Sequence, residues 1–370
     1  MSSSSLLSST IPTIEWSPLL PDSWLKEKPT SEILSREEMF VKERKRMALQ
    51  GINSFQFEPN SGQILFSYGS GIYLGQVTKG MEFNPYPIIP YSCCPNTPLH
   101  HMSHANSTSP SYSPSSSSMP PSYCSTSNFS PPRLDPKLGG RNNNLIAFIR
   151  DRDIWVTTPG GSETQLTFCN EHDPDGTAAL SCGVAEFVMQ EEFHRFTGYY
   201  WAPSSSSSNN HRKDDVERIL YIQLSESMVD LVLIPRPGPH GEVDEYRYPR
   251  TGTANAQCIL QIVEFIPQHE DEEVVICGPI HKRLWGSFAL KKLFPWMEYI
   301  VRFGCVWVQL LDRLQQRTAI VKIALCNFMS IEEYQKCTPE IEELYRGFIE
   351  VIFEERNHIW INVSNGNNHL

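Results

Sequence analysis

Two adjacent carboxylates, Glu191 and Glu192, lie at the centre of an apolar and aromatic stretch that spans residues 184–203. A mainly apolar run precedes the pair. A cluster of aromatic residues follows it: Phe193, Phe196, Tyr199, Tyr200 and Trp201. A carboxylate beside so much apolar surface is costly to bury unless a cation or a hydrogen-bond donor meets it. We therefore interpret Glu191 and Glu192 as a receptor for a positive charge.

The adjacency of the two glutamates limits how they can share a ligand. Neighbouring side chains in a regular α-helix diverge by about 100°, so both carboxylates reach one cation only at an irregular turn or at the end of a helix. An ammonium bound by both would keep both ionised, whereas without it like-charge repulsion should raise the apparent pKa of one member. Solvated Glu–Glu pairs are common, so the dipeptide alone does not separate a binding site from ordinary surface.

The charge balance of the 370-residue chain narrows the class of ligand. Its formal net charge is −11, which argues against a nucleic-acid-binding protein that neutralises phosphates. It favours cationic ligands or simple solubility. Apolar residues make up 40% of the chain and aromatic residues 11%, enough for a sizeable core in one large or two medium domains. We expect neither a cofactor nor a metal.

The N-terminus and the cysteines bear on cellular location. The first ten residues contain neither a basic region nor a long apolar run, so we expect no secretory signal. No run of about 18 apolar residues occurs, so we expect no membrane-spanning helix. The ten cysteines form no CxxC pair and no regular framework. We therefore expect reduced, mostly buried thiols and a cytoplasmic protein.

The elements that must position the two glutamates begin with a helix. Residues 1–30 are rich in Ser and Pro and are expected to be flexible. Residues 31–50 contain strong helix formers, which predict a helix that packs on the following domain and is ended by Gly51. Its charge run, residues 42–46, is interpreted for the most part as a solvated helix face.

Beyond Gly51 the pattern changes to short strands separated by turns. The segments that predict strands are residues 55–57, 64–68, 72–74, 145–149, 153–156, 165–168, 218–222, 229–234, 258–265, 298–303, 306–311 and 319–324. Residues 331–347 are expected to be helical or irregular. An antiparallel meander of this spacing predicts a sandwich, a barrel or propeller blades.

Two segments share one phrase and favour radial repetition. Residues 145–156 and residues 351–361 both read as a strand, a polar turn and then Ile-Trp-Val or Ile-Trp-Ile. We interpret them as equivalent strand pairs in different blades, which favours a propeller over a sandwich.

Polar segments interrupt and end this pattern. The inserts at residues 95–133 and 204–215 are rich in Ser and other polar residues, with few aliphatic side chains. Such segments cannot bury enough apolar surface to offset their ordering entropy, so we expect them to be disordered. Residues 364–370 form a polar tail.

Five stretches, taken together, indicate a family. Residues 183–201 pair Gln-Glu-Glu-Phe with Gly-Tyr-Tyr-Trp. The others are Glu43–Arg46 with Gly51–Ser54, Asp135–Leu138, Tyr246–Asn255, and Leu310–Arg313 with Ile359–Asn362. Taken in chain order, over about residues 31–363, they resemble the dipeptidyl peptidase IV family. The resemblance is closest to its cytosolic branch, the dipeptidyl peptidase 8 and 9 type.

The resemblance implies a fold and roles for matching residues. It implies an N-terminal β-propeller, which in that family is followed by an α/β-hydrolase domain with a Ser-Asp-His triad. Glu191 and Glu192 would bind the free N-terminal ammonium of a peptide. Arg46 matches the family arginine that helps to position the substrate backbone near its second residue. Anchoring the N-terminus would place the bond after the second residue at the serine, which is catalysis by positioning.

The chain departs from the family pattern because it contains no Gly-x-Ser-x-Gly nucleophile elbow. We therefore assign no catalytic residue and expect the hydrolase domain to be absent, together with the last propeller blades. The fold expected for residues 51–363 is all-β: a partial β-propeller of the dipeptidyl peptidase IV N-terminal type, with a leading helix and disordered inserts.

Two functions remain open at this point. The chain is either the substrate-gating part of a cytosolic post-proline dipeptidyl peptidase, inert alone, or a non-catalytic propeller. The latter would bind peptide N-termini or act as a decoy partner by pairing with itself or with a full-length relative. A WD-repeat scaffold is disfavoured because no Gly-His…Trp-Asp signature recurs. Neither hypothesis includes a nucleic acid or a membrane as partner.

Overall fold

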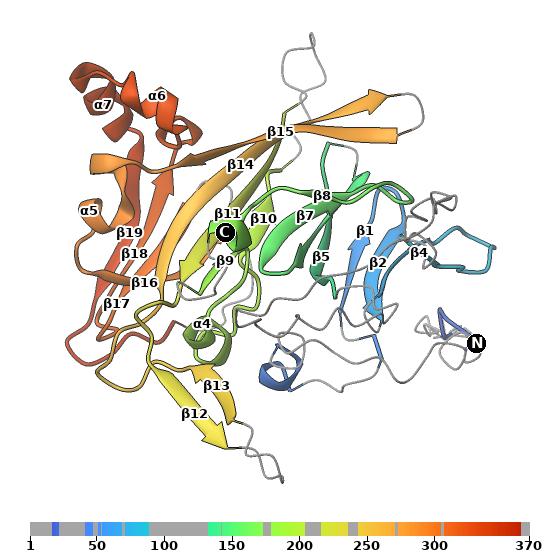
Figure 1. The fold of residues 1–370 in the computed structure, drawn as a ribbon, viewed down its shortest axis with the longest axis horizontal. Helices are drawn as coiled ribbons and strands as arrows, with labels where there is room; N and C mark the ends of the chain where they lie inside the picture. The colour runs from blue at the N-terminus through green and yellow to red at the C-terminus, as the bar shows by residue number, and fades with distance from the viewer. Residues whose placement is uncertain are drawn as a thin grey trace, which may run out of the picture.

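The chain folds into antiparallel sheets that follow one another in sequence order (Figure 1). The computed structural model describes residues 17–21, 41–46, 51–52, 54–68, 71–88, 132–141, 143–172, 179–203, 216–235, 243–270, 273–304 and 307–363. The segments expected to be flexible or disordered, at residues 1–30, 95–133, 204–215 and 364–370, lie almost entirely outside the described residues.

Four of the described sheets form the body of the molecule. The first contains β1 (Phe55–Glu58), β2 (Gln63–Tyr68), β3 (Gly71–Gln76) and β4 (Tyr86–Pro87). The second contains β5 (Leu134–Gly139), β6 (Leu145–Arg150), β7 (Asp153–Thr157) and β8 (Thr164–Gln165). The third contains β10 (Tyr199–Trp201), β11 (Glu217–Ser225), β14 (Gln257–Glu270) and β15 (Glu273–Arg283), with β9 (Leu180–Cys182) also paired to β11. The fourth contains β16 (Met297–Gly304), β17 (Trp307–Asp312), β18 (Arg317–Ile323) and β19 (Ile349–Arg356).

Strand β6 shows why the sheets pack face to face. Its first five residues are all apolar and all buried, so both faces of the strand need cover. One face joins a cluster with the first sheet: Leu65, Ile72, Leu74, Ile88, Leu138, Ile146 and Phe148. The other face joins a cluster with the third sheet, which includes Leu145, Ala147, Ile149, Tyr199, Ile219, Tyr221 and Val263. The third sheet in turn packs on the fourth through Leu220, Ile222, Ile262, Ile300, Phe303, Val308 and Leu310.

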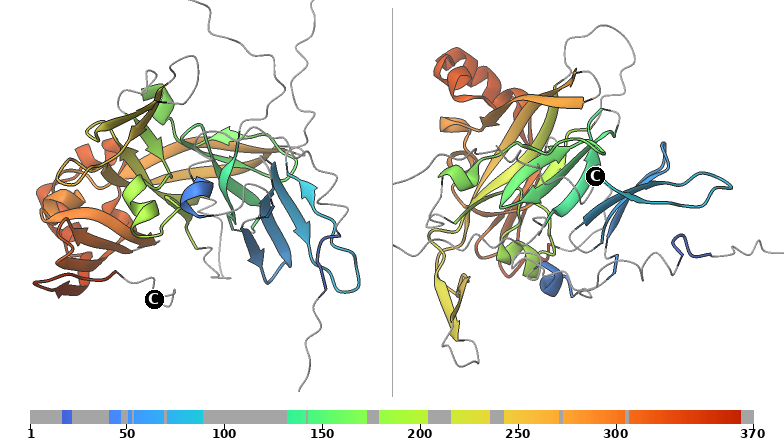
Figure 2. Two further views of the ribbon diagram at one scale, coloured as in Figure 1. Left: turned by 90° about the horizontal axis from the view of Figure 1, so that it is seen from below. Right: turned by 45° about the vertical axis from the view of Figure 1, so that its right-hand side comes forward.

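This succession is a fan of blades, from the first sheet at one side of Figure 1 to the fourth at the other. Figure 2 shows the same order from below and after a 45° turn about the vertical axis. Within the described part of the chain the architecture is therefore all-β and that of a partial β-propeller, as the sequence predicts. The predicted strands are confirmed with shifts of a few residues at their ends, except at residues 165–168, where only Gln165 lies in a strand.

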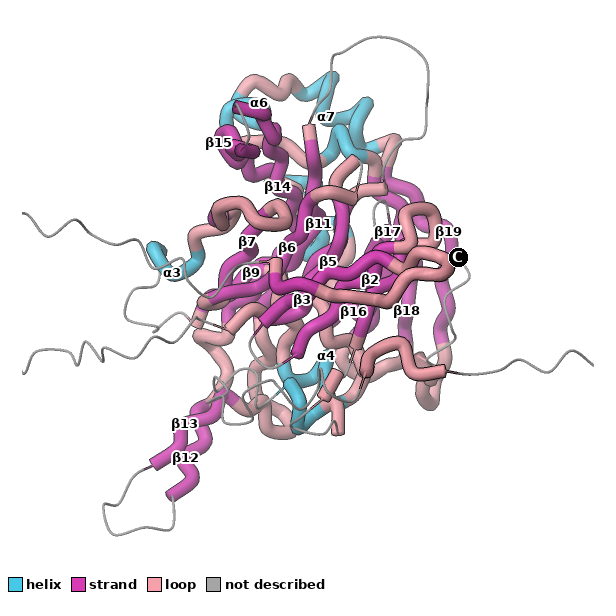
Figure 3. Tube along the Cα trace, turned by 90° about the vertical axis from the view of Figure 1, so that its right-hand side faces the viewer, coloured by secondary structure: helices cyan, strands magenta, loops and turns pink. Residues whose placement is uncertain are grey.

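Several elements lie outside the four sheets. A hairpin of β12 (Leu231–Pro235) and β13 (Val243–Arg247) projects away from the body (Figures 1 and 3). The helices are short: α3 (Cys169–His172), α4 (Phe187–Glu191), α5 (Leu290–Leu293), α6 (Ile331–Gln335) and α7 (Pro339–Arg346), with 3₁₀ turns at Gly286–Phe288 and Leu325–Asn327. Of the described helices, none combines the length and the apolar character that crossing a bilayer demands.

The predicted repeat of strand pairs is wrong at its second copy. Residues 349–356 form β19, but Ile359, Trp360 and Ile361 are not in a strand. The Ile361 N–H instead donates to the carbonyl of Gln315, in the turn between β17 and β18. A matching phrase does not make a strand unless a neighbouring strand offers its hydrogen-bonding edge.

The expectation of reduced thiols is wrong for one pair of cysteines. Cys169, in α3, and Cys182, in β9, are buried and form a disulfide across 13 residues of sequence. The pairing brings together two elements that the sequence does not show to be neighbours. Among the described cysteines the free thiols are Cys258, Cys277, Cys326 and Cys337.

The leading helix is described only over residues 41–46. It is helical at 41–44 and turns at Lys45 and Arg46. The Arg46 N–H donates to the Glu43 carbonyl at 2.9 Å, and Arg46 has a positive φ of 54°. This segment therefore ends its helix before Gly51, and it places Arg46 in the turn rather than on a helix face.

Candidate functional site

Helix α4 positions the two candidate glutamates. Glu186 caps its N-terminus, and the Glu186 carboxylate accepts from the Val188 N–H at 2.7 Å. At the other end the Glu192 N–H donates to the Val188 carbonyl, and the Arg195 N–H donates to the Met189 carbonyl. His194, with φ of 51°, turns the chain away from the helix.

Glu191 is the last residue of α4, and Glu192 follows it in the C-cap position. The pair thus lies at a helix end, one of the arrangements in which the sequence allows two adjacent carboxylates to meet one ligand. Glu191 is partly exposed and Glu192 is exposed. The carbonyls at a helix C-terminus carry partial negative charge and favour a cation there, so this end of α4 attracts positive charge from two sources.

The structure brings Arg46 to Glu191 from a distant part of the chain. Arg46 Nη2 lies 3.8 Å from Glu191 Oε2, and 75% of the Arg46 side chain is exposed. The short N-terminal helix lies beside α4 in Figures 1 and 2. Of the three residues proposed from the sequence, Arg46 and Glu191 form an ion pair, and Glu192 is adjacent to that pair.

The basic run before Arg46 is not the solvated helix face that its composition suggests. Arg44 Nη1 donates to Gln190 Oε1 at 2.9 Å, and its guanidinium carbon lies 4.9 Å from the centre of the Phe187 ring. Lys45 Nζ lies 5.2 Å from the centre of the Phe196 ring. Both side chains are half-buried. The expectation is therefore wrong for Arg44 and Lys45, because the apolar and amide groups of the α4 segment cover them.

The aromatic residues after the pair hold the segment in the third sheet. Tyr199 is fully buried, and its hydroxyl donates to the Ala147 carbonyl at 3.0 Å. Lys137 lies over the Tyr199 ring with 3.8 Å from Nζ to the ring centre, and donates to the Tyr199 carbonyl at 2.6 Å. Trp201 lies against Gly139, whose missing Cβ makes room for the indole. These two aromatics anchor β10, the strand after α4, between the second and third sheets.

Arg195 is a buried support residue that the sequence does not single out. Its guanidinium donates to the carbonyls of Val301 at 2.9 Å, Thr197 at 2.7 Å and Ile300 at 3.2 Å. It also lies over the ring of Phe303. These contacts connect the turn after α4 to β16. In the sequence Arg195 is a single charged residue among aromatic ones. That pattern does not distinguish a buried arginine from one on the surface.

Burial raises the pKa values of two carboxyl groups near α4. Burial raises the pKa of Glu186 to about 7, although the Val188 N–H and Arg195 lower it in part. Burial also raises the pKa of Glu226, against the nearby cations of Arg247 and Arg44. The neighbourhood of the candidate site therefore contains a carboxyl group that titrates near neutral pH.

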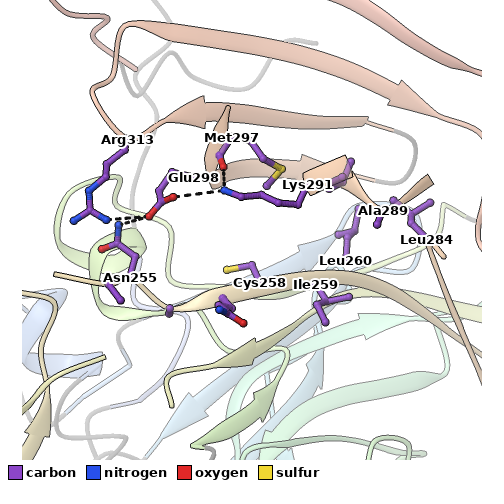
Figure 4. A pocket seen from close by; sticks show the side chains of 14 residues that line it. Asn255, Cys258, Ile259, Leu260, Leu284, Ala289, Lys291, Met297, Glu298 and Arg313 are labelled. Atoms are coloured by element: carbon purple, nitrogen blue, oxygen red, sulfur yellow. Dashed lines mark hydrogen bonds and ion pairs between the residues drawn. The ribbon is translucent and has the colours of Figure 1, made fainter. Parts of the chain in front are cut away.

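A cavity of about 600 Å³ lies between the start of β14 and β16 (Figure 4). Its wall is partly apolar, with Leu260, Leu284, Leu290 and Met297 among the lining residues. At one end Glu298 pairs with Arg313 at 3.2 Å and with Lys291 at 3.6 Å. The two cations of the cavity thus share one carboxylate as their partner. Its lining does not include the candidate residues at the end of α4.

Asp153, Cys169 and Cys182 place metal-ligand types of atom within 4.8 Å of one another, all buried. Two of the three are the disulfide cysteines. Asp153 Oδ1 accepts from the Thr167 hydroxyl at 2.7 Å and from the Cys169 N–H at 2.8 Å. The two sulfur atoms are thus bonded to each other, and the Asp153 carboxylate is hydrogen-bonded to protein groups.

Comparison with known proteins bears on the family. Residues 112–370 match the family model described as the dipeptidyl peptidase IV (DPP IV) N-terminal region. The chain is 32% identical over 366 residues to dipeptidyl peptidase 8 of Homo sapiens, and 31% identical over 369 residues to dipeptidyl peptidase 8 of Mus musculus. Each alignment covers 95% of this chain and 36% of the relative, so the chain spans little more than a third of these relatives. The chain therefore belongs to the dipeptidyl peptidase IV N-terminal region family, and its sheets form a partial β-propeller of that type.

Proposed function

We propose that the chain is the substrate-gating propeller region of a post-proline dipeptidyl peptidase, in which Glu191 and Glu192 bind the N-terminal ammonium of a peptide. The observation that carries this proposal is the ion pair of Arg46 with Glu191 at the exposed end of α4. Because Glu191 already forms an ion pair with a guanidinium, this end of α4 is suited to binding a positive charge. Family membership supports the choice of a peptide as the ligand.

The arrangement would act by positioning. An ammonium between the two carboxylates makes charge-assisted hydrogen bonds, which are the strong class of hydrogen bond. Arg46, drawn partly away from Glu191, would be free to donate to a backbone carbonyl of the peptide. A fixed amino terminus then sets which peptide bond meets a nucleophile. From the family resemblance we expect this to be the peptide bond after the second residue.

Calorimetry with the peptide Gly-Pro-Ala tests the proposal on the purified chain. The double variant Glu191→Gln with Glu192→Gln should weaken binding by about 10-fold or more, since a hydrogen bond to a charged group contributes about 1.5–3 kcal/mol. The matched control is Glu342→Gln with Glu343→Gln in α7, which makes the same charge change on another side of the molecule. Equal losses in both variants would reject a specific ammonium site.

We further propose that these 370 residues bind peptide without cleaving it. The support is the absence of a Gly-x-Ser-x-Gly phrase in the sequence. A chromogenic substrate, Gly-Pro-p-nitroanilide, should show no turnover above a buffer control. Robust turnover by the purified chain would overturn this part of the proposal and leave the binding site in place.

A cytosolic location is proposed on the resemblance to the cytosolic branch of the family. Fractionation of cells that express the chain, with detection by antibody, should recover it with cytosolic markers. Recovery in a secretory fraction would contradict this location.

A further inference from the structure

Arg44 connects the N-terminal helix to α4 at the point where the candidate site is built. Its Nη1 donates to Gln190 Oε1 at 2.9 Å, and its guanidinium lies over Phe187. Gln190 is itself nearly inaccessible, with 3% of its surface exposed. Its amide nitrogen donates to the Ala185 carbonyl, at the start of the α4 segment. The acceptor that Arg44 uses is therefore held in place from its other end.

The hydrogen bond between Arg44 and Gln190 lies next to the ion pair between Arg46 and Glu191. Gln190 immediately precedes Glu191, and Arg44 lies two residues before Arg46. Between Arg44 and Arg46 the chain is closed into a turn by Lys45 N–H to the Val41 carbonyl and Arg46 N–H to the Glu43 carbonyl. The direction in which Arg46 leaves the backbone is therefore set by where Arg44 is held.

The contact suits arginine rather than lysine. A planar guanidinium can donate in its plane to an amide oxygen while its face lies on an aromatic ring. An ammonium is a compact charge and does not offer a flat face. Phe187 is in turn packed at 4.9 Å between ring centres on Tyr248, so the ring beneath Arg44 is backed by the chain beyond β13.

We infer that Arg44 is a positioning residue that aligns Arg46 with Glu191 by docking the N-terminal helix on Gln190 and Phe187. Arg44 acts through Arg46 and does not itself contact the ligand. The inference rests on the proposed function for its effect on peptide binding. Its effect on the geometry of the Arg46–Glu191 pair does not depend on any ligand.

A double-mutant cycle separates action through Arg46 from an independent effect. Arg44→Met keeps an apolar side chain on Phe187 and removes the hydrogen bond and the charge. It should weaken binding of Gly-Pro-Ala to the same extent as Arg46→Gln, about 10-fold for a hydrogen bond to a charged group. The combined variant should bind no more weakly than Arg46→Gln alone. Gln190→Leu, which removes the acceptor from the other side, should reproduce the loss.

The controls address charge and folding. Lys42→Met removes one positive charge from the same helix, at a side chain that is also half-buried, and should change the affinity by less than about 3-fold. Arg44→Lys keeps the charge and should not restore binding. Thermal unfolding midpoints of all variants show whether the fold is retained. If the losses at Arg44 and Arg46 are additive, or if Lys42→Met has the same effect, Arg44 does not act by positioning Arg46.

Crystal structures of the unliganded chain and of Arg44→Met provide the readout that is independent of ligand. The Arg46–Glu191 pair, 3.8 Å apart here, should persist in the unmodified chain and be lost in the variant. Retention of the pair in Arg44→Met overturns the positioning role, whatever the binding data show. If the unmodified chain binds Gly-Pro-Ala and acetyl-Gly-Pro-Ala equally, the proposed function fails. The crystallographic comparison still decides the role of Arg44.

Discussion

Glu186 connects the stability of α4 to pH at the scale of a single residue. Its carboxylate caps the helix, and burial raises its pKa from an ordinary 4.5 to about 7. The folded state therefore holds the Glu186 proton more tightly than the unfolded state does. Between about pH 4.5 and 7 this group lowers the free energy of unfolding as pH rises. Its cost is absent below pH 4.5 and complete above pH 7.

Replacing Glu186 by Gln should remove this pH dependence. The amide oxygen of Gln can still accept from the Val188 N–H, so the cap is kept while the buried charge is removed. Urea unfolding from pH 5 to pH 8 should show a stability difference between variant and parent that grows with pH. The growth is at most about 3 kcal/mol, from the shift in pKa and 1.36 kcal/mol for each pH unit. The control Glu343→Gln, on α7, should keep the slope of the parent, and an unchanged slope in Glu186→Gln would contradict the assignment.

The sequence identifies the candidate residues of the site more readily than the residues that hold them. Glu191 and Glu192 are noticeable as adjacent carboxylates in an aromatic stretch, but their role, and the choice of Arg46, come from the family resemblance. Arg44 and Arg195 are not, because their roles depend on contacts with residues far along the chain. From sequence alone, a run of basic residues is predicted to be solvent-exposed, because the residues that cover it in the fold are not known.

At the scale of the element, two glycines allow the segment before α4 to cross the strand after it. An ideal Cβ on Gly198 would lie 2.4 Å from the Gly183 carbonyl carbon, a backbone atom that cannot move aside. The Gly183 N–H donates to the Ile222 carbonyl, and the Ile222 N–H donates to the Gly198 carbonyl. Both glycines are thus fixed against β11. The close approach explains the glycine at the start of the Gly-Tyr-Tyr-Trp phrase.

Gly198→Ala should therefore lower the free energy of unfolding by about 3 kcal/mol or more, at the upper end of what overpacking costs. Gly347→Ala is the matched control, because Gly347 has a φ of −63° that alanine adopts freely; it should change stability by less than about 1 kcal/mol. Urea unfolding monitored by tryptophan fluorescence measures both. Equal effects of the two substitutions would show that the crossing near Gly183 is not tight.

The disulfide between α3 and β9 should stabilise the strand that leads to α4. Closing a loop of this length contributes about 3 kcal/mol in the chain-entropy description. A thiol reductant should lower the urea midpoint of the parent chain accordingly. The double variant Cys169→Ala with Cys182→Ala should be insensitive to reductant. A parent midpoint that does not respond to reductant would contradict a contribution of this bond to stability.

Elements were predictable where the signal is local. Strands such as β6 and β11 follow from apolar runs and their bounding turns. The disulfide and the end of the N-terminal helix were not predictable, because each depends on tertiary contact. The strand expected at Ile359–Ile361 failed for the same reason: the N–H of Ile361 is taken by a turn.

At the scale of the whole molecule, the blades bring together segments that are remote in sequence. A separate apolar cluster fills each junction between successive sheets of the fan. The N-terminal helix and α4 meet at its lower edge in Figure 1. The fold class could be predicted from strand spacing together with the family resemblance. The way in which successive blades pack on one another could not be predicted, because it is set by contacts between sheets.

The central claim is that the end of α4 recognises the free amino terminus of a peptide. The most direct measurement is the ratio of dissociation constants of the unmodified chain for Gly-Pro-Ala and for acetyl-Gly-Pro-Ala, by calorimetry at pH 7. Acetylation removes the charge and leaves the rest of the peptide unchanged. Acetylation should weaken binding by about 10-fold or more, because hydrogen bonds to a charged group are lost. Equal affinity for the two peptides would contradict it.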